Sequence, residues 1–131
     1  MMKKLVLLYI NGLILTLIIG LNFSHAATCE MTSKEISNVR AACAVNNNSL
    51  IFQIHNENES IVVSYLDFKI KYGSYEGIIR AHSGDVWPKQ VSSSFYSPAP
   101  ASLRGRTISS AQLSCSIDRA FRLKQGFFDW C

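Results

Sequence analysis

The chain of 131 residues has few of the features that identify an enzyme or a nucleic-acid-binding protein. It contains three histidines, no Gly-x-Ser-x-Gly motif and no CxxC or HxxxH spacing, so neither a serine nucleophile nor a zinc site is indicated. Charge is also scarce, with 13 Lys and Arg against 9 Asp and Glu, and this balance does not predict binding to nucleic acid. No internal repeat, low-complexity tract or linker divides the chain, which favours one domain.

The first 26 residues have the pattern of a signal peptide. A lysine pair precedes an apolar run over residues 5–21, and Ser24 and Ala26 are the small side chains that a signal peptidase requires. We place cleavage after Ala26, which leaves residues 27–131 as the mature chain, with 11 basic and 9 acidic residues. The alternative is an uncleaved membrane anchor, because the run approaches the ~20 residues that span a bilayer. Both alternatives predict an exported domain, either periplasmic or extracellular.

All four cysteines lie in the predicted mature chain, at Cys29, Cys43, Cys115 and Cys131. An even number of cysteines in an exported chain predicts two disulfides. The spacing favours one bridge from Cys43 to Cys115 across the core and one from Cys29 to Cys131 between the ends of the domain. The nearest-neighbour pairing, which joins Cys29 to Cys43 and Cys115 to Cys131, stays open. With the cysteines in bridges, no metal ion or cofactor is predicted.

Alternation of apolar and polar residues predicts antiparallel β-strands. The predicted strands, bounded by Gly, Asn, Ser and Pro, cover residues 49–55, 61–72, 77–81, 91–96 and 111–123, with a further strand ending near residue 45 after a short helical segment. In the last strand the pattern places Phe121 on the inward face, and Arg122 and Lys124 on the outward face with Asp118. Residues 83–85, Ser-Gly-Asp, are expected to form a turn. Close spacing of short strands predicts an all-β fold, a small antiparallel sandwich of six or seven strands.

The strand, polar turn and long strand over residues 50–72 resemble small immunoglobulin-like β-sandwich domains of bacterial envelope proteins. Such modules mostly serve as binding or accessory domains, and this is what the resemblance implies for function. No motif matches residue by residue, so the resemblance assigns no functional residue.

Two histidines remain in the mature chain as candidates for catalysis. His55 and His82 each have a carboxylate a few residues away, the minimum for general acid–base chemistry or for a shared metal ion. Polar rings at strand ends are common without any catalytic role, so a small hydrolase or metal-dependent enzyme using His55 and His82 is the alternative function. The preferred function is a non-enzymatic binding or accessory module that recognises another exported protein.

The C-terminal segment Gly126-Phe127-Phe128-Asp129-Trp130-Cys131 is the most unusual part of the sequence. Phe127, Phe128 and Trp130 would form a strong interaction site if they were exposed. In small domains such a tail more often packs over the open end of the core, and this arrangement is expected here. The possible interface is therefore Phe127, Phe128 and Trp130, and a membrane is a partner only if the leader is retained.

Overall fold

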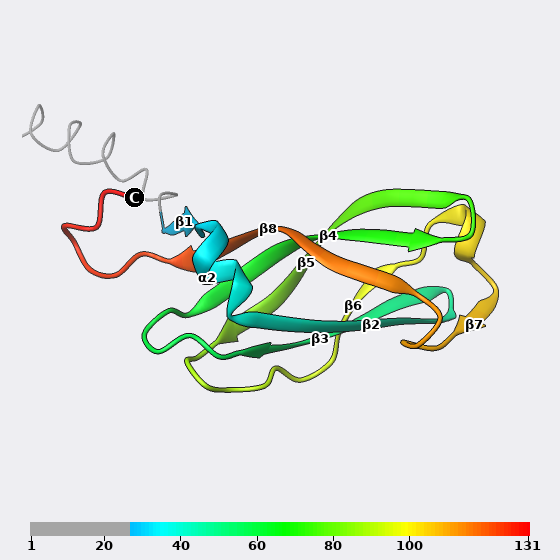
Figure 1. The fold of residues 1–131 in the computed structure, drawn as a ribbon, viewed down its shortest axis with the longest axis horizontal. Coiled ribbons are helices and arrows are strands. Elements are labelled where there is room, and N and C mark those ends of the chain that lie inside the picture. The colour runs from blue at the N-terminus through cyan, green and yellow to red at the C-terminus, as the bar shows by residue number, and fades with distance from the viewer. Residues whose placement is uncertain (1–26) are drawn as a thin grey trace, which may run out of the picture.

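The protein folds as a sandwich of two antiparallel four-stranded sheets (Figure 1). The computed structural model describes residues 27–131, so the predicted signal peptide lies outside the described residues. The elements are β1 (Thr28–Glu30), α2 (Ser33–Ser37), β2 (Val39–Asn47), β3 (Ser49–Asn56), β4 (Val63–Tyr72), β5 (Tyr75–Val86), β6 (Phe95–Pro98), the 3-10 helix η1 (Ala101–Leu103), β7 (Arg106–Ile108) and β8 (Ser114–Leu123). The sheet orders are β1-β8-β4-β5 and β6-β3-β2-β7. The predicted all-β sandwich is confirmed, but it has eight strands instead of six or seven. Two of the strands, β1 and β7, are too short to show alternation in the sequence.

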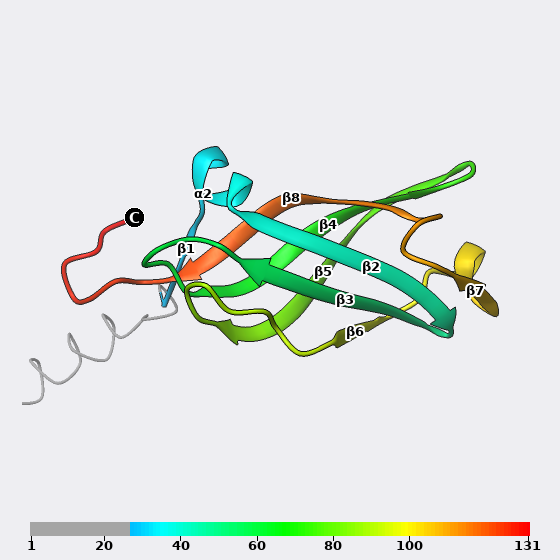
Figure 2. The same cartoon turned by 60° about the horizontal axis from the view of Figure 1, so that its bottom comes forward.

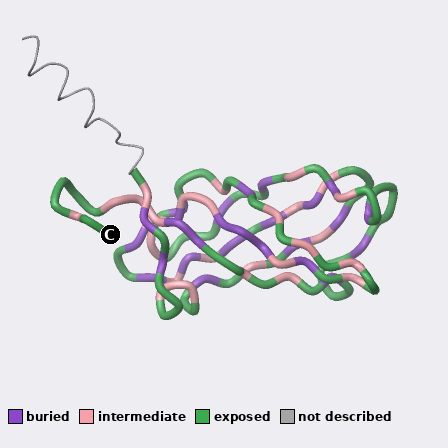
Figure 3. The backbone as a smooth tube through the Cα atoms, turned by 90° about the horizontal axis from the view of Figure 1, so that it is seen from above, coloured by how far each residue is buried: buried purple, intermediate pink, exposed green. Residues whose placement is uncertain are grey.

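The core lies between the sheets, where the inward residues of β3 meet those of β4. Leu50, Phe52 and Ile54 of β3 are buried, as their alternation predicts. Phe52 stacks on Phe68 of β4 with ring centroids 4.3 Å apart, which joins the two layers at their centre. Figure 2 shows β2 beside β3 with β4 and β5 in the layer behind, and Figure 3 shows buried residues alternating with exposed ones along the strands. Burial of these side chains is the main favourable contribution to folding.

Two disulfides close the domain, and they follow the pairing that the spacing favours. Cys43 on β2 is bonded to Cys115 on β8, with Cα atoms 6.2 Å apart, so this bridge joins the two sheets. Cys29 on β1 is bonded to Cys131, with Cα atoms 5.5 Å apart. Two bridges are consistent with an oxidising environment, and each contributes about 2–4 kcal/mol to stability in a domain of this size.

The short helix α2 is defined by its cap. The hydroxyl oxygen of Thr32 accepts a hydrogen bond from the backbone N–H of Glu35, and the Glu35 carboxylate accepts one from the N–H of Thr32. This capping box satisfies two N–H groups that the helix itself leaves unpaired. The helix ends at Ser37, and β2 begins at Val39, as the change from helical to alternating pattern predicts.

Strand boundaries differ from the sequence prediction at three places, apart from shifts of one or two residues. The strand predicted over residues 111–123 begins only at Ser114, because the N–H groups of Gln112 and Leu113 both donate to the Ser109 carbonyl in a turn, where Ala111 is exposed. The expected turn at residues 83–85 is a bulge inside one long strand, β5, because Val63 pairs with Val86 whereas Tyr65 pairs with His82. Within the bulge, Gly84 has φ +71° and Ser83 Oγ donates a hydrogen bond to the Ser64 carbonyl.

The strand predicted over residues 91–96 begins only at Phe95. In the preceding segment only an isolated bridge pairs Val91 with His55, and the Ser92 N–H donates to the Ile54 carbonyl in this bridge. The Ser92 hydroxyl accepts from the Ile54 N–H, so a side chain takes the place of further strand pairing.

The inward–outward alternation of β8 is interrupted by a bulge. Asp67 on β4 pairs with Arg119 whereas Phe68 pairs with Ile117, so Asp118 is an extra residue on β8. The prediction that Phe121 points inward is therefore wrong. Beyond the bulge it is Ala120 that is fully buried in the core, and Arg122 follows Ala120 onto the inward side instead of the outward side.

Candidate functional site

The seven residues 125–131 after β8 form a loop that we call the C-terminal aromatic loop. Its side chains Phe127, Phe128 and Trp130 are 82%, 77% and 78% exposed, the highest values among the large hydrophobic residues of the described chain. The expectation that they pack over the core is wrong, because the loop extends beyond the end of the sandwich (Figure 1). The structure therefore presents these side chains to solvent, as an interface would.

Asp129 organises the loop from within. Its carboxylate accepts hydrogen bonds from the Gln125 N–H at 2.7 Å and from the Cys131 N–H at 3.1 Å. The same carboxylate forms an ion pair with Arg122 at 2.6 Å, and both side chains are nearly buried. The Arg122 guanidinium, followed by the two N–H donors, holds the pKa of Asp129 well below its ordinary range. Asp129 in turn raises the pKa of Arg122. The loop thus closes around one carboxylate.

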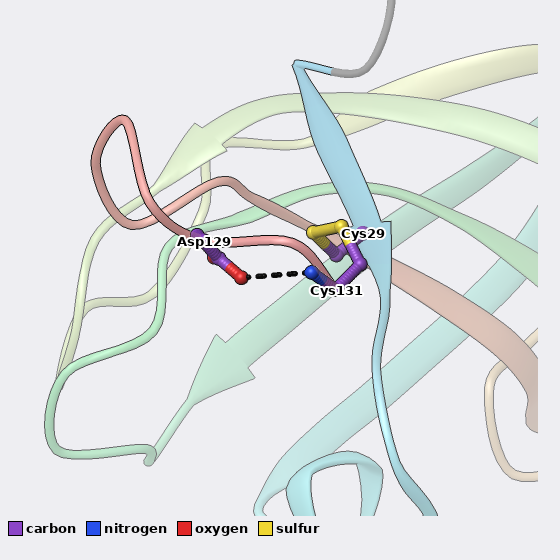
Figure 4. A group of neighbouring side chains, drawn as sticks. All are labelled: Cys29, Asp129 and Cys131. Atoms are coloured by element: carbon purple, nitrogen blue, oxygen red, sulfur yellow. Dashed lines mark hydrogen bonds between the residues drawn. A yellow bond between two sulfur atoms is a disulfide. The ribbon is translucent and has the colours of Figure 1, made fainter.

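Two further contacts fasten the loop to the sandwich, and a glycine turns the chain between them. The disulfide ties Cys131 to Cys29 on β1 (Figure 4). The Gln125 side-chain amide donates to the Ser60 carbonyl at 2.8 Å. Gly126 turns the chain with φ +97°, a backbone conformation that residues other than glycine rarely adopt. The backbone of the loop is therefore held at both ends while its aromatic side chains point away.

The loop offers aromatic surface with one positive charge beside it. Phe127 and Phe128 meet edge to face with centroids 5.1 Å apart, which is a favourable aromatic geometry. The Lys124 ammonium lies 6.0 Å from the centre of the Trp130 ring. This surface has the chemistry of a protein contact, since aromatic residues with few degrees of freedom lose little entropy on binding.

Three potential metal ligands lie together at this loop, but they do not form a metal site while the disulfide between two of them is intact. Ligand atoms of Cys29, Asp129 and Cys131 lie within 4.8 Å of one another (Figure 4). However, the two sulfur atoms are bonded to each other, and metal binding by cysteine requires a thiolate.

The two histidines proposed for an enzyme are not brought together. His55 lies on β3 between the buried Ile54 and Asn56, so it faces away from the core on one sheet. His82 lies on β5 next to the buried Ala81 and faces away from the core on the other sheet. The sandwich separates the two rings, so they share neither a cleft nor a metal ion.

Alternation did not predict an ion-pair and aromatic cluster on the outer face of the β1-β8-β4-β5 sheet. Tyr65 stacks on Phe121 at 4.4 Å, and the Arg80 guanidinium lies 5.1 Å from the centre of the Tyr65 ring. Arg80 also binds the buried Asp67 carboxylate through two hydrogen bonds, which lower the pKa of Asp67. The sequence places Asp67 at an outward position but does not show that these neighbours cover it. These charges are paired with each other, so the cluster stabilises the sheet and leaves no free ligand-binding group.

No helix within residues 27–131 is long and apolar enough to cross a membrane. Comparison with protein-family models, with curated proteins and with solved structures finds no match for this chain.

Proposed function

We propose that this protein is an exported, non-enzymatic binding module that recognises another exported protein through the C-terminal aromatic loop. The observation that carries the proposal is the combination of exposure and order in the loop. Three large aromatic side chains are more than three-quarters exposed, while Asp129 and the bridge to Cys29 fix their backbone.

Exposure of this kind is costly for a protein that stays alone. Apolar surface left in water forgoes about 25 cal/mol for each Å² that could have been buried. A loop that is already ordered also loses less conformational entropy when it binds, which favours affinity. A protein partner is the better match than a bilayer, because the predicted mature chain has a small net charge and its loop carries an internal ion pair.

The alternative function, a small enzyme using His55 and His82, gains no support from their positions on opposite faces of the sandwich. No other observation favours it, so we develop only the binding function.

The proposal is tested by crosslinking the tagged protein in its native exported fraction and identifying captured proteins by mass spectrometry. Each captured protein is then purified and its affinity measured directly. Wild type is compared with the triple variant Phe127→Ser, Phe128→Ser, Trp130→Ser, which keeps Cys131. We expect the variant to lose at least about 30-fold in affinity, which is the effect of losing a single hot-spot residue worth about 2 kcal/mol.

Two matched controls define what counts against the proposal. Ile78→Ser removes an exposed hydrophobic side chain on β5, far from the loop in the chain, and should leave the affinity unchanged. Protein-free vesicles of anionic phospholipid test the bilayer directly. Loop-dependent binding to these vesicles, or equal affinity of wild type and triple variant for every purified partner, would contradict recognition of a protein.

A further inference from the structure

Both sheets of the sandwich have an uncovered edge on the same side of the molecule. On one sheet, β7 pairs with β2 only at residues 45–47, so residues 39–44 have no strand beside them on this side within the described chain. On the other sheet, β1 pairs with β8 only at residues 121–123, which leaves the edge of residues 114–119 uncovered. In Figures 1 and 2 these two strands, β2 and β8, run along the same side of the sandwich.

A groove of about 200 Å³ lies between the two uncovered edges. It is lined by Ile36, Val39, Ala41, Cys115, Ser116 and Ile117. Four of these residues, Ile36, Ala41, Cys115 and Ile117, are only half-buried although they pack against the core. The bridge from Cys43 to Cys115 joins the two strands that flank the groove. Apolar side chains are therefore accessible at the place where backbone hydrogen-bonding groups are also uncovered.

We propose that this groove binds an extended segment of another polypeptide, which adds to β8 as a further strand. Uncovered N–H and C=O groups on a strand edge repeat with the spacing of another β-strand, so an extended backbone is the ligand that matches them. The same edge already accepts an antiparallel strand, because β1 pairs with it at residues 121–123. An added strand would pair with residues 114–117, which lie on the other side of the Asp118 bulge from β1.

The side chains define the chemistry of the bound segment. Cys115 and Ile117 are half-buried and pack against the core, whereas Ser114 and Ser116 alternate with them and are exposed, although Ser116 also lines the groove. The bound segment therefore has apolar residues at every second position, directed into the groove, and polar residues between them. Asp118 and Arg119 are charged and Asp118 forms a bulge, and both features oppose strand addition at that end of the edge. Residues 114–117 contain no charged residue and no proline, so this part of the edge is the one open to an added strand. This surface is distinct from the C-terminal aromatic loop, and the inference does not depend on the proposed function.

A synthetic peptide tests the inference without knowledge of the natural partner. The probe is a capped peptide of about nine residues in which Val alternates with Thr, a pattern suited to strand addition. Amide hydrogen exchange of the native, disulfide-bonded protein is followed by NMR with and without the peptide at millimolar concentration. We expect exchange to slow at least about tenfold at alternate residues of 114–117, where the N–H groups face the added strand.

Two controls separate backbone pairing from general apolar adhesion. A peptide N-methylated at the residues that pair with β8 should not slow exchange, whereas a peptide N-methylated at the other residues should. In the protein, Ala41→Glu places a charge in the groove and should abolish binding, while Ala42→Glu places it on the exposed face of β2 and should not. Circular dichroism and thiol titration are used to check that both variants fold with their disulfides formed, and the two N-methylated peptides still test the inference if one variant does not.

Three results would overturn the inference: no slowing of exchange with any peptide, equal slowing with both N-methylated peptides, or slowing confined to the opposite edge strand β5. If the protein alone forms a dimer that protects residues 114–117, a second copy and not a separate partner occupies the groove, and the inference is also wrong.

Discussion

Asp129 shows how one residue determines whether the aromatic side chains are available. Its carboxylate is the common acceptor for the Gln125 N–H, the Cys131 N–H and the Arg122 guanidinium. The sequence predicted Arg122 on a solvated strand face and gave Asp129 no role. That error has a physical cause, because an extra residue in β8 turned Arg122 toward the end of the core, where Asp129 meets it.

We expect Asp129→Asn to loosen the C-terminal aromatic loop without unfolding the sandwich. The amide side chain keeps the shape but loses the charge that pairs with Arg122, and hydrogen bonds to charged groups are the stronger ones. Amide exchange at Gln125 and Cys131 should accelerate by at least about tenfold. The control is Asp118→Asn, which removes an exposed carboxylate from the same region of β8. Similar exchange in both variants would show that Asp129 does not hold the loop.

The low pKa of Asp129 also predicts how the loop responds to pH. A carboxyl whose pKa is lowered by folding stabilises the folded state above its ordinary pKa, because there the unfolded state binds no additional proton. This stabilisation is lost as pH falls below about 4, the ordinary value for aspartate. Exchange at Gln125, corrected for intrinsic rates, should therefore be constant from pH 7 to 5 and show loss of protection only in stronger acid. Loss of protection between pH 7 and 5 would contradict the ion pair.

The elements that the sequence predicted well are those with uninterrupted alternation. Residues 49–55 correspond to β3, and the inward positions of residues 66–70 in β4 are fully buried, because period-two patterning directly reports which face meets the core. Gly84 looked like a turn but forms a bulge, since local composition does not show whether a glycine reverses a strand or only bends it. The bulge at Asp118 was missed because nothing in the local sequence marks an extra residue.

Deletion of single residues in β8 tests the assignment of that bulge. Removing Asp118 leaves Ile117 and Ala120 inward and Arg119 outward, so the sandwich should keep both disulfides and melt within a few degrees of wild type. The control is removal of Ser116, which shifts one part of β8 by a residue. The shift would either turn the Asp118 side chain toward the core or turn Cys115 away from Cys43 so that their bridge cannot form. Burial of an unpaired carboxylate or loss of a bridge should lower stability by at least about 2 kcal/mol. Equal melting temperatures for the two deletions would place the bulge elsewhere.

At the scale of the whole molecule, the sandwich and the aromatic loop have separate roles. The core is complete without Phe127, Phe128 and Trp130, because Phe52, Phe68 and their neighbours already fill the space between the sheets. The composition of the tail identified the candidate residues, but it could not decide whether they are buried. That outcome depends on the direction in which the chain leaves β8, which the Arg122–Asp129 ion pair and the bridge to Cys29 determine.

Thermal unfolding of the triple variant Phe127→Ser, Phe128→Ser, Trp130→Ser tests most directly whether the aromatic side chains form a contact surface separate from the core. Phe68→Ala is the positive control, and it should cost about 3–5 kcal/mol because Phe68 is fully buried. We predict that the triple variant melts within about 2 °C of wild type, less than the 4–8 °C that corresponds to 1 kcal/mol in a domain of this size. A decrease comparable to that of Phe68→Ala would show that the three aromatic residues belong to the core of the fold.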